Sequence, residues 1–146
     1  MTAFKKLIAI IGIFAFGWYV SAAFANPYDW KVTRAVDGDT VEIQVNWLPA
    51  ELGDKLKIRV FGVDTPEKGF RAKCESEAKR GEAATKFTKD LLASGKKIQV
   101  EIKEWDKFGG RVLGDVLVDG KSLRAELIKN GYAREYFGDA KKSWCE

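Results

Sequence analysis

Apolar and polar residues alternate in four short segments of the chain, and a fifth segment, residues 30–36, precedes them. Val41, Ile43 and Val45, for example, are separated from one another by single polar residues. Because successive side chains of a strand point to opposite faces, this period of two predicts strands with one buried face. The predicted strands cover residues 30–36, 41–46, 56–61, 98–103 and 112–118. Asp37-Gly38, a dipeptide typical of hairpin turns, joins the first two.

Two other segments have the wider spacing of a helix. In residues 81–94 the apolar residues Ala84, Phe87 and Leu91 fall on one face, and Gly95 is a natural stop. Ser122 can cap a second helix, which ends at Asn130-Gly131. The residues of this second helix that we expect to face inward are Leu123, Leu127 and Ile128.

Five short strands, with one helix before the fourth and one after the fifth, predict an α+β fold. The expected architecture is a five-stranded OB-type β-barrel with two main helices. Residues 26–146 form one domain in this interpretation, because 146 residues are too few for two sizeable cores. An OB barrel presents one curved face to oligonucleotides or oligosaccharides, but the fold alone identifies no activity.

The first 25 residues are interpreted as an N-terminal hydrophobic export segment, that is, a signal peptide. Lys5 and Lys6 precede a mostly apolar run, and Ala23-Phe24-Ala25 matches a small-x-small cleavage site. The alternative is an uncleaved membrane anchor, because residues 7–25 approach the span of a thin bilayer. We therefore expect an exported protein, periplasmic or secreted. The alternative is a protein tethered through residues 7–25, with its domain outside the cytoplasm.

The composition narrows the possible chemistry. The net charge is +4, and two of the 25 basic residues lie in the leader, so charge alone is weak evidence for a polyanionic partner. The chain has no histidine, which excludes Ser-His-Asp hydrolysis, Cys-His proteolysis and any histidine general base. With two cysteines it also lacks the ligands of a His/Cys zinc site. Hydrolytic chemistry would have to rest on carboxylates, lysine, arginine, tyrosine or an oxygen-bound metal.

Three polar motifs lie next to the ends of predicted strands, and a fourth, a single arginine, lies inside one. Each has an ordinary structural explanation when it is taken alone: a hairpin turn, a surface arginine, a proline turn and a glycine loop. Arg59, however, points to the opposite face from Ile58 and Val60, and the acids of the third motif follow it closely. The motifs are Asp37-Gly38-Asp39-Thr40, Arg59, Asp64-Thr65-Pro66-Glu67, and the loop from Asp106 to Arg111.

In order and spacing, these four motifs resemble the staphylococcal-nuclease-like (thermonuclease) family over about residues 30–137. The resemblance implies an OB barrel and a calcium-dependent nuclease that hydrolyses phosphodiester bonds of DNA and RNA with low sequence specificity. It also implies that the carboxylates of Asp39 and Asp64 and the backbone carbonyl of Thr65 bind Ca²⁺. Arg59 and Arg111 would bind the scissile phosphate and stabilise its transition state. Glu67 would act as general base on a water.

These implied roles agree with general chemistry. Ca²⁺ takes six to eight oxygen ligands, so two carboxylates and a carbonyl would leave positions for water and a phosphate oxygen. Guanidinium groups meet phosphate oxygens with two parallel donors, which lysine does not reproduce. The alternative is a non-catalytic nucleic-acid-binding or protein-binding OB module. No motif points to a protein partner, and we expect a monomer.

The chain departs from the family pattern in the loop and in the tail. Two glycines, Gly109 and Gly110, precede Arg111 where the family has one, so we expect the loop to bulge. Phe108 stands where the family often has tyrosine. The third helix of the family is reduced to residues 139–146. Three aromatic residues either contact the nucleotide or pack against the helices, and the sequence does not decide between these roles. They are Tyr132, Tyr136 and Phe137.

The two cysteines predict one disulfide in an exported chain. Cys74 follows the third motif and Cys145 is the penultimate residue. We hypothesise that a bond between them ties the short tail to the loop before the first helix. Closing so long a loop would stabilise the fold by roughly 4 kcal/mol in the chain-entropy model.

Overall fold

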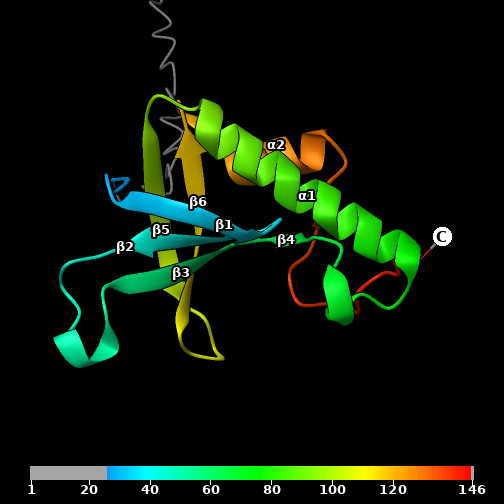
Figure 1. Cartoon of the computed structure of the whole chain (residues 1–146), viewed down its shortest axis with the longest axis horizontal. Helices are drawn as coiled ribbons and strands as arrows, with labels where there is room; N and C mark the ends of the chain where they lie inside the picture. The colour runs from blue at the N-terminus through cyan, green and yellow to red at the C-terminus, as the bar shows by residue number, and fades with distance from the viewer. Residues whose placement is uncertain (1–25, 146) are drawn as a thin grey trace, which may run out of the picture.

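The structure is a computed structural model that describes residues 26–145 (Figure 1). The predicted export segment, its alternative as a membrane anchor, and Glu146 lie outside the described residues. Within residues 26–145 there is no helix with both the length and the apolar character that crossing a bilayer requires.

All five predicted strands and both predicted helices are present. The strands are β1 (Lys31–Asp37), β2 (Thr40–Gln44), β3 (Lys55–Val60), β4 (Val63–Asp64), β5 (Ile98–Trp105), β6 (Arg111–Val118), β7 (Lys121–Ser122) and β8 (Arg134–Glu135). The α-helices are α1 (Glu75–Ser94) and α2 (Leu123–Lys129), and two short 3₁₀-helices are η1 (Ala50–Leu52) and η2 (Gly69–Arg71).

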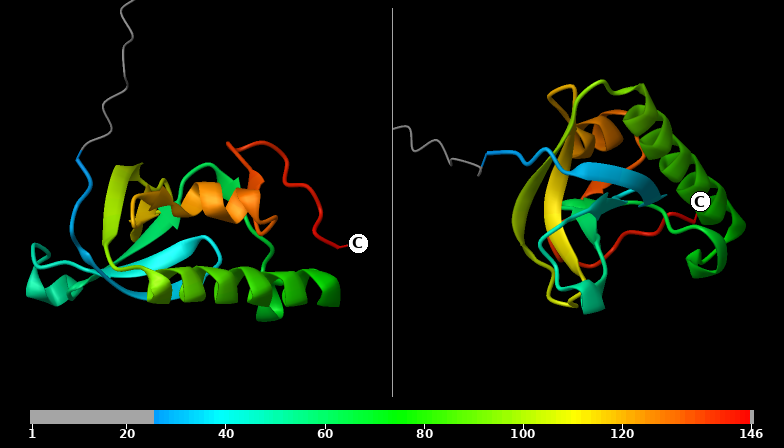
Figure 2. Two further views of the ribbon diagram at one scale, coloured as in Figure 1. Left: turned by 90° about the horizontal axis from the view of Figure 1, so that it is seen from above. Right: turned by 60° about the vertical axis from the view of Figure 1, so that its left-hand side comes forward.

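The main sheet has the strand order β1-β2-β3-β6-β5, with β7 paired to β6. Its pairings are antiparallel except that between β3 and β6, which is parallel. Figure 2 shows the sheet curling so that β5 and β6 stand across the first three strands. An isolated antiparallel bridge between Tyr28 and Val100 connects the segment before β1 to β5. The fold is therefore an α+β arrangement in which a curled sheet carries two helices.

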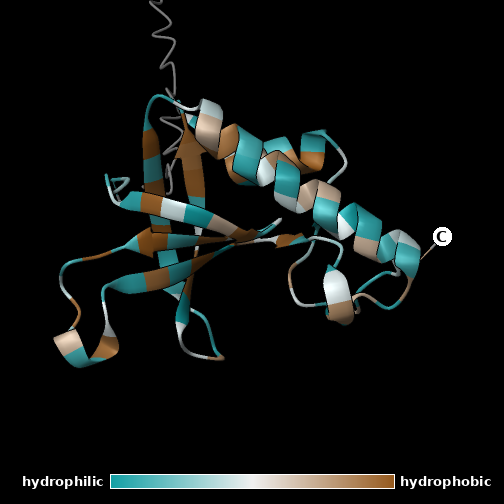
Figure 3. Cartoon of the chain, in the orientation of Figure 1, coloured by the Kyte–Doolittle hydropathy of each residue, from teal (hydrophilic) through white to brown (hydrophobic). Residues whose placement is uncertain are grey.

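The core follows the alternation seen in the sequence, which Figure 3 displays along the strands. In β3, Leu56, Ile58 and Val60 are buried, whereas Arg59 lies on the other face. The helices close the curl: α1 contacts β1, and α2 contacts β6. The Thr88 hydroxyl of α1 also donates a hydrogen bond of 2.6 Å to the carbonyl oxygen of Gly38 in the β1–β2 turn. This contact fixes the position of the Asp37-Gly38 turn relative to the helix.

Helix α1 begins at Glu75, six residues before the predicted start. Its N-cap is Cys74, whose sulfur accepts the backbone N–H of Glu77 at 3.4 Å. Gly81 lies inside the helix. Glycine is suited to this position because a Cβ there would come within 2.4 Å of the carbonyl oxygen of Glu67. Gly95 does end the helix, but with a φ of −74°. Its small size matters because a Cβ would lie 2.4 Å from Val118.

Candidate active site

A cavity of about 480 Å³ opens where β3, the β1–β2 turn, the β5–β6 loop and the chain after α2 meet. Five of the six residues predicted to form the site line it: Asp39, Arg59, Thr65, Glu67 and Arg111. Asp64 is not part of the cavity wall. Lys141, which pairs with the Asp64 carboxylate, lines the cavity in its place.

Asp39 lies in the β1–β2 turn, directly before β2, and is 1% exposed. Its Oδ1 accepts a hydrogen bond of 2.7 Å from Nη1 of Arg59, and its Oδ2 accepts one of 2.9 Å from the Thr65 hydroxyl. Burial raises the pKa of Asp39 to about 6, although the nearby Arg59 guanidinium acts to lower it. The neighbouring Asp37 carboxylate also raises this pKa. A divalent cation beside Asp39 would offset the cost of its buried charge.

Asp64 ends the two-residue strand β4 and is also buried. Its Oδ2 accepts a hydrogen bond of 2.9 Å from the indole N–H of Trp144. Its Oδ1 lies 2.6 Å from Nζ of Lys141, but accepts no hydrogen bond from residues 26–145. The Lys141 ammonium therefore occupies the place at this oxygen that a metal ion would take.

Glu67 projects from the loop between β4 and η2, with a side chain 35% exposed. Its carboxylate lies 3.3 Å from Nε of Arg71. Its backbone is held from the other side, because the N–H of Glu67 donates to Oε1 of the buried Glu77 at 3.3 Å. Oε2 of Glu77 accepts the N–H of Lys73 at 2.7 Å. Thus one carboxylate of α1 accepts N–H groups from both ends of the segment 67–73, which contains η2.

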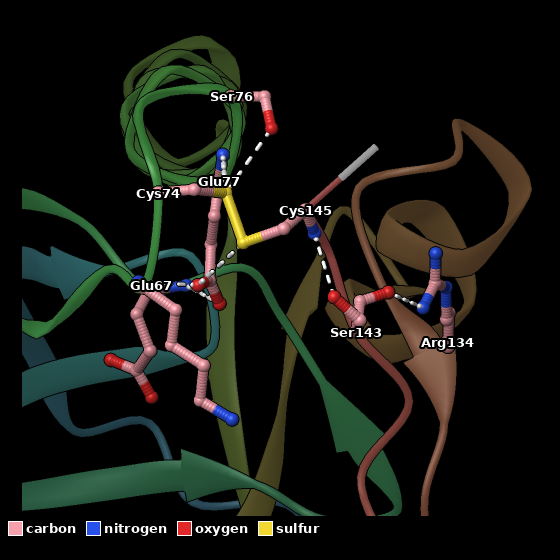
Figure 4. The surroundings of a disulfide bond; sticks show 8 residues. Glu67, Cys74, Ser76, Glu77, Arg134, Ser143 and Cys145 are labelled. Atoms are coloured by element: carbon pink, nitrogen blue, oxygen red, sulfur yellow. Dashed lines mark hydrogen bonds between the residues drawn. A yellow bond between two sulfur atoms is a disulfide. The ribbon is translucent and has the colours of Figure 1, made fainter.

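The hypothesised Cys74–Cys145 disulfide is confirmed, with Cα atoms 5.9 Å apart. Figure 4 shows Glu77 reaching from α1 past the disulfide towards the backbone of Glu67, whose own carboxylate points away from the sulfurs. Sγ of Cys145 lies 3.9 Å from Oε2 of Glu77. The disulfide therefore packs against the carboxylate that holds the Glu67 loop.

Arg111 opens β6 and pairs with the buried Asp106. Burial acts to raise the pKa of Asp106, but hydrogen bonds from Arg111 and from the Phe108 N–H outweigh it, so this pKa lies below its usual value. Gly109 and Gly110 take positive φ angles of 70° and 68°, so the double glycine forms the tight end of the loop.

The structure separates the aromatic residues that the sequence left open. Tyr132 stacks on Phe87 of α1 with ring centroids 4.6 Å apart, which is structural packing. Tyr136 and Phe137 line the cavity. Phe108 also lines it, and its ring is largely exposed. These three rings are thus available to a ligand.

Sequence reasoning missed several polar residues of the site. Asp37 lines the cavity, and its buried Oδ1 has no hydrogen-bond partner in the described part of the chain. Asp106 orients Arg111. Asp37 and Asp106 both belong to motifs that the sequence analysis identified, so their positions next to predicted site residues could have indicated that they belong to the site. Lys141 and Trp144 lie in the tail, where the sequence carried no comparable pattern.

The oxygen atoms of the site are ligands that suit a hard cation such as Ca²⁺. The cavity region offers carboxylate and carbonyl oxygens, and the buried oxygens Asp37 Oδ1 and Asp64 Oδ1 have no hydrogen-bond partner among residues 26–145. No three carboxylates of the described residues come within 4.8 Å of one another there, so water or substrate oxygens would complete the coordination. Within residues 26–145, the one triad of acid and sulfur groups that close together is Cys74, Glu77 and Cys145, and the disulfide uses both of its sulfurs.

Comparison with known proteins agrees with the geometry. The family described as Staphylococcal nuclease homologue matches residues 57–144. The chain is 41% identical over 103 residues to Endonuclease YncB of Bacillus subtilis (strain 168), covering 69% of this chain and 44% of that protein. It is 32% identical over 115 residues to the Thermonuclease of Staphylococcus hyicus, covering 77% and 62%. With Endonuclease YhcR of Bacillus subtilis (strain 168) the identity is 36% over 117 residues, covering 77% and 9%. The chain thus spans less than two thirds of each of these relatives.

Proposed function

Because the chain belongs to the staphylococcal nuclease homologue family, we propose that it is a nuclease that hydrolyses phosphodiester bonds of nucleic acid. The observation that carries the proposal is that Asp39, Arg59, Thr65, Glu67 and Arg111 line one cavity. A binding module would need basic and aromatic residues there, but would not need Glu67 beside them. The relatives named as endonucleases and a thermonuclease support the same reaction.

We propose Ca²⁺ as the cofactor, held by the carboxylates of Asp39 and Asp64 and the carbonyl of Thr65. When bound, the ion would polarise the phosphoryl group and lower the pKa of nearby water. Lys141 would have to leave Asp64 for the ion to bind. The support for these ligands is that the acids present only oxygen atoms, and that a cation, the Lys141 ammonium, already lies 2.6 Å from Oδ1 of Asp64.

The remaining chemistry falls to three side chains. Arg59 and Arg111 donate to the oxygens of the scissile phosphate, where negative charge grows in the transition state. Each is held by a buried acid, Asp39 or Asp106, and keeps further N–H groups for the substrate. Glu67 accepts a proton from the attacking water, and its partial exposure leaves room for that water.

We propose DNA and RNA as substrates, with low sequence specificity. Phosphate contacts and stacking on Phe108, Tyr136 and Phe137 would read the backbone and base faces rather than base edges. The scaffold would be a five-stranded OB-type barrel, which the curled sheet and the Tyr28–Val100 bridge support. We further propose a monomer that is exported, since its disulfide suits an oxidising compartment.

The test is cleavage of a fluorescent single-stranded DNA by purified protein with Ca²⁺ and then with EGTA, for the wild type and Glu67→Gln. We expect cleavage only with Ca²⁺, and a loss of about 10²–10⁴ in kcat for the variant with binding retained. Glu51→Gln, an exposed acid outside the cavity, is the matched control. Tight binding without cleavage by the wild type would instead favour a non-catalytic binding module.

A further inference from the structure

The last residues of the described chain return to the site. We call residues 139–145 the C-terminal strap. It leaves the cavity at Lys141 and ends at Cys145, whose disulfide joins it to Cys74 at the start of α1. In Figure 1 the C-terminus accordingly lies beside that end of the helix. Although it is close to the chain terminus, Trp144 of the strap is only 6% exposed.

Trp144 is held by two side chains, one on β4 and one on β8. Its indole N–H donates to Oδ2 of Asp64, and the Arg134 guanidinium lies 3.7 Å from the centre of its ring. Arg134 also donates to the carbonyl oxygen of Ser143 at 2.8 Å, a contact visible in Figure 4. Arg134 and Asp64 are register partners in the β4–β8 pair. Trp144 of the strap, Arg134 of β8 and Asp64 of β4 thus each contact the other two.

Lys141 of the same strap faces the other oxygen of this carboxylate. Its Nζ lies 2.6 Å from Oδ1, the oxygen that accepts no hydrogen bond among the described residues. The Lys141 side chain is 43% exposed, so it has room to move away into the cavity that it lines. A cation that binds Oδ1 must therefore displace an ammonium group.

We infer that the C-terminal strap sets the metal affinity of the site. Trp144 is a positioning residue that orients the Asp64 carboxylate, and Lys141 is an internal cation that competes with the metal for Oδ1 of this carboxylate. The inference rests on the proposed role of Asp64 as a metal ligand. Hydrogen bonds to a ligating carboxylate typically change metal affinity about 10–100-fold when they are removed.

The disulfide is the covalent part of this device. Cys145 directly follows Trp144, so the disulfide bond to Cys74 limits how far the indole of Trp144 can move from Asp64. Without it, Trp144 would be held by the Arg134 contact and one hydrogen bond, near a chain end that tends to fray. Metal affinity should therefore fall when the disulfide is reduced.

The experiment is calorimetric titration of the purified protein with Ca²⁺, which needs no nuclease activity. Trp144→Phe keeps a smaller aromatic ring and removes the N–H donor, so we expect its Kd to rise about 10–100-fold. Trp47→Phe, at an exposed tryptophan outside the cavity, should leave the Kd unchanged. Lys141→Met should lower the Kd, because the competing charge is gone. The two strap variants should therefore change the Kd in opposite directions, which a general loss of structure would not do.

Two further variants distinguish an error in the proposed ligand role of Asp64 from an error in the strap inference. If Asp64→Asn leaves the Kd unchanged, the proposed ligand role of Asp64 is wrong. If Asp64→Asn weakens binding while Trp144→Phe and Lys141→Met do not alter it, the strap inference is overturned and the ligand role stands. The double variant Cys74→Ser/Cys145→Ser, shown to be folded by circular dichroism, should bind Ca²⁺ more weakly than the wild type. If Trp144→Phe fails to fold, Lys141→Met, a substitution of a half-exposed side chain, still decides the question.

Discussion

Replacing Gly81 by alanine sets two physical effects against each other. Gly81 lies inside α1, where alanine is favoured over glycine by about 1 kcal/mol. By helix propensity alone the substitution should stabilise the protein. The structure predicts the opposite, because the added Cβ would lie 2.4 Å from the carbonyl oxygen and 2.6 Å from the carbonyl carbon of Glu67.

The size of the effect follows from these distances. Ordinary contact begins at 3.4 Å, so the Glu67 backbone or the helix must shift by roughly 1 Å. Overpacking of this kind costs about 1–3 kcal/mol, which cancels or exceeds the gain in propensity. A displacement of about 1 Å at a catalytic group can cost about 10² in rate. Since Glu67 is the proposed base, we expect kcat to fall by about that factor while the free energy of unfolding falls by about 0–2 kcal/mol.

The assay combines urea unfolding with single-stranded DNA cleavage. Ala83→Gly, at an exposed position of the same helix, is the control for propensity alone and should cost about 1 kcal/mol without changing kcat. If Gly81→Ala raised the stability by about 1 kcal/mol and kept full activity, the helix would not press on Glu67. The account of how the base is held would then be wrong.

Three further predictions concern other parts of the molecule. Arg59→Lys should lower kcat on single-stranded DNA by about 10²–10³, because lysine cannot both hold Asp39 and present paired donors to the phosphate. Reducing the Cys74–Cys145 disulfide, whose residues are 71 apart, should lower the free energy of urea unfolding by about 4 kcal/mol. Burial raises the pKa of Asp115 despite its hydrogen bonds, so its stabilising contribution is complete below the unfolded pKa and is lost as pH rises through the folded pKa. In urea unfolding, Asp115→Asn should therefore gain stability relative to the wild type as the pH rises above about 4, the usual pKa of an aspartate.

The parts of the fold that depend on local pattern were predictable. Four of the five main strands were predicted from the period of two, and α2 starts where the Ser122 hydroxyl accepts the Ala125 N–H, as its cap predicts. The first two turns of α1 were missed because Gly81 opposes a helix and Cys74 is an unusual cap. Strands β4 and β8 have two residues each, too few to show any period.

The site was predictable where motifs lie at strand ends, and unpredictable where distant segments meet. Asp39 and Arg59 come together because Thr40 and Arg59 are register partners on β2 and β3. Lys141 and Trp144 reach Asp64 only through the path of the tail, and no local spacing encodes that path. The same holds for Glu77, which acts on the Glu67 loop from a helix face.

The arrangement of charges explains how the cavity could be ready for a phosphate before one arrives. Each of the two proposed phosphate-binding arginines pairs with an acid that is far more buried than itself: the side chains of Arg59 and Arg111 are 20% and 31% exposed, against 2% and 6% for Asp39 and Asp106. The buried acid therefore orients the guanidinium from behind, and the exposed N–H groups face the cavity. Such donors need little reorganisation when negative charge develops, which is the condition under which they lower a barrier most. Asp39 would do this while also binding the metal, so loss of its carboxylate should impair both phosphate binding and metal binding, whereas loss of the Asp106 carboxylate should impair phosphate binding alone.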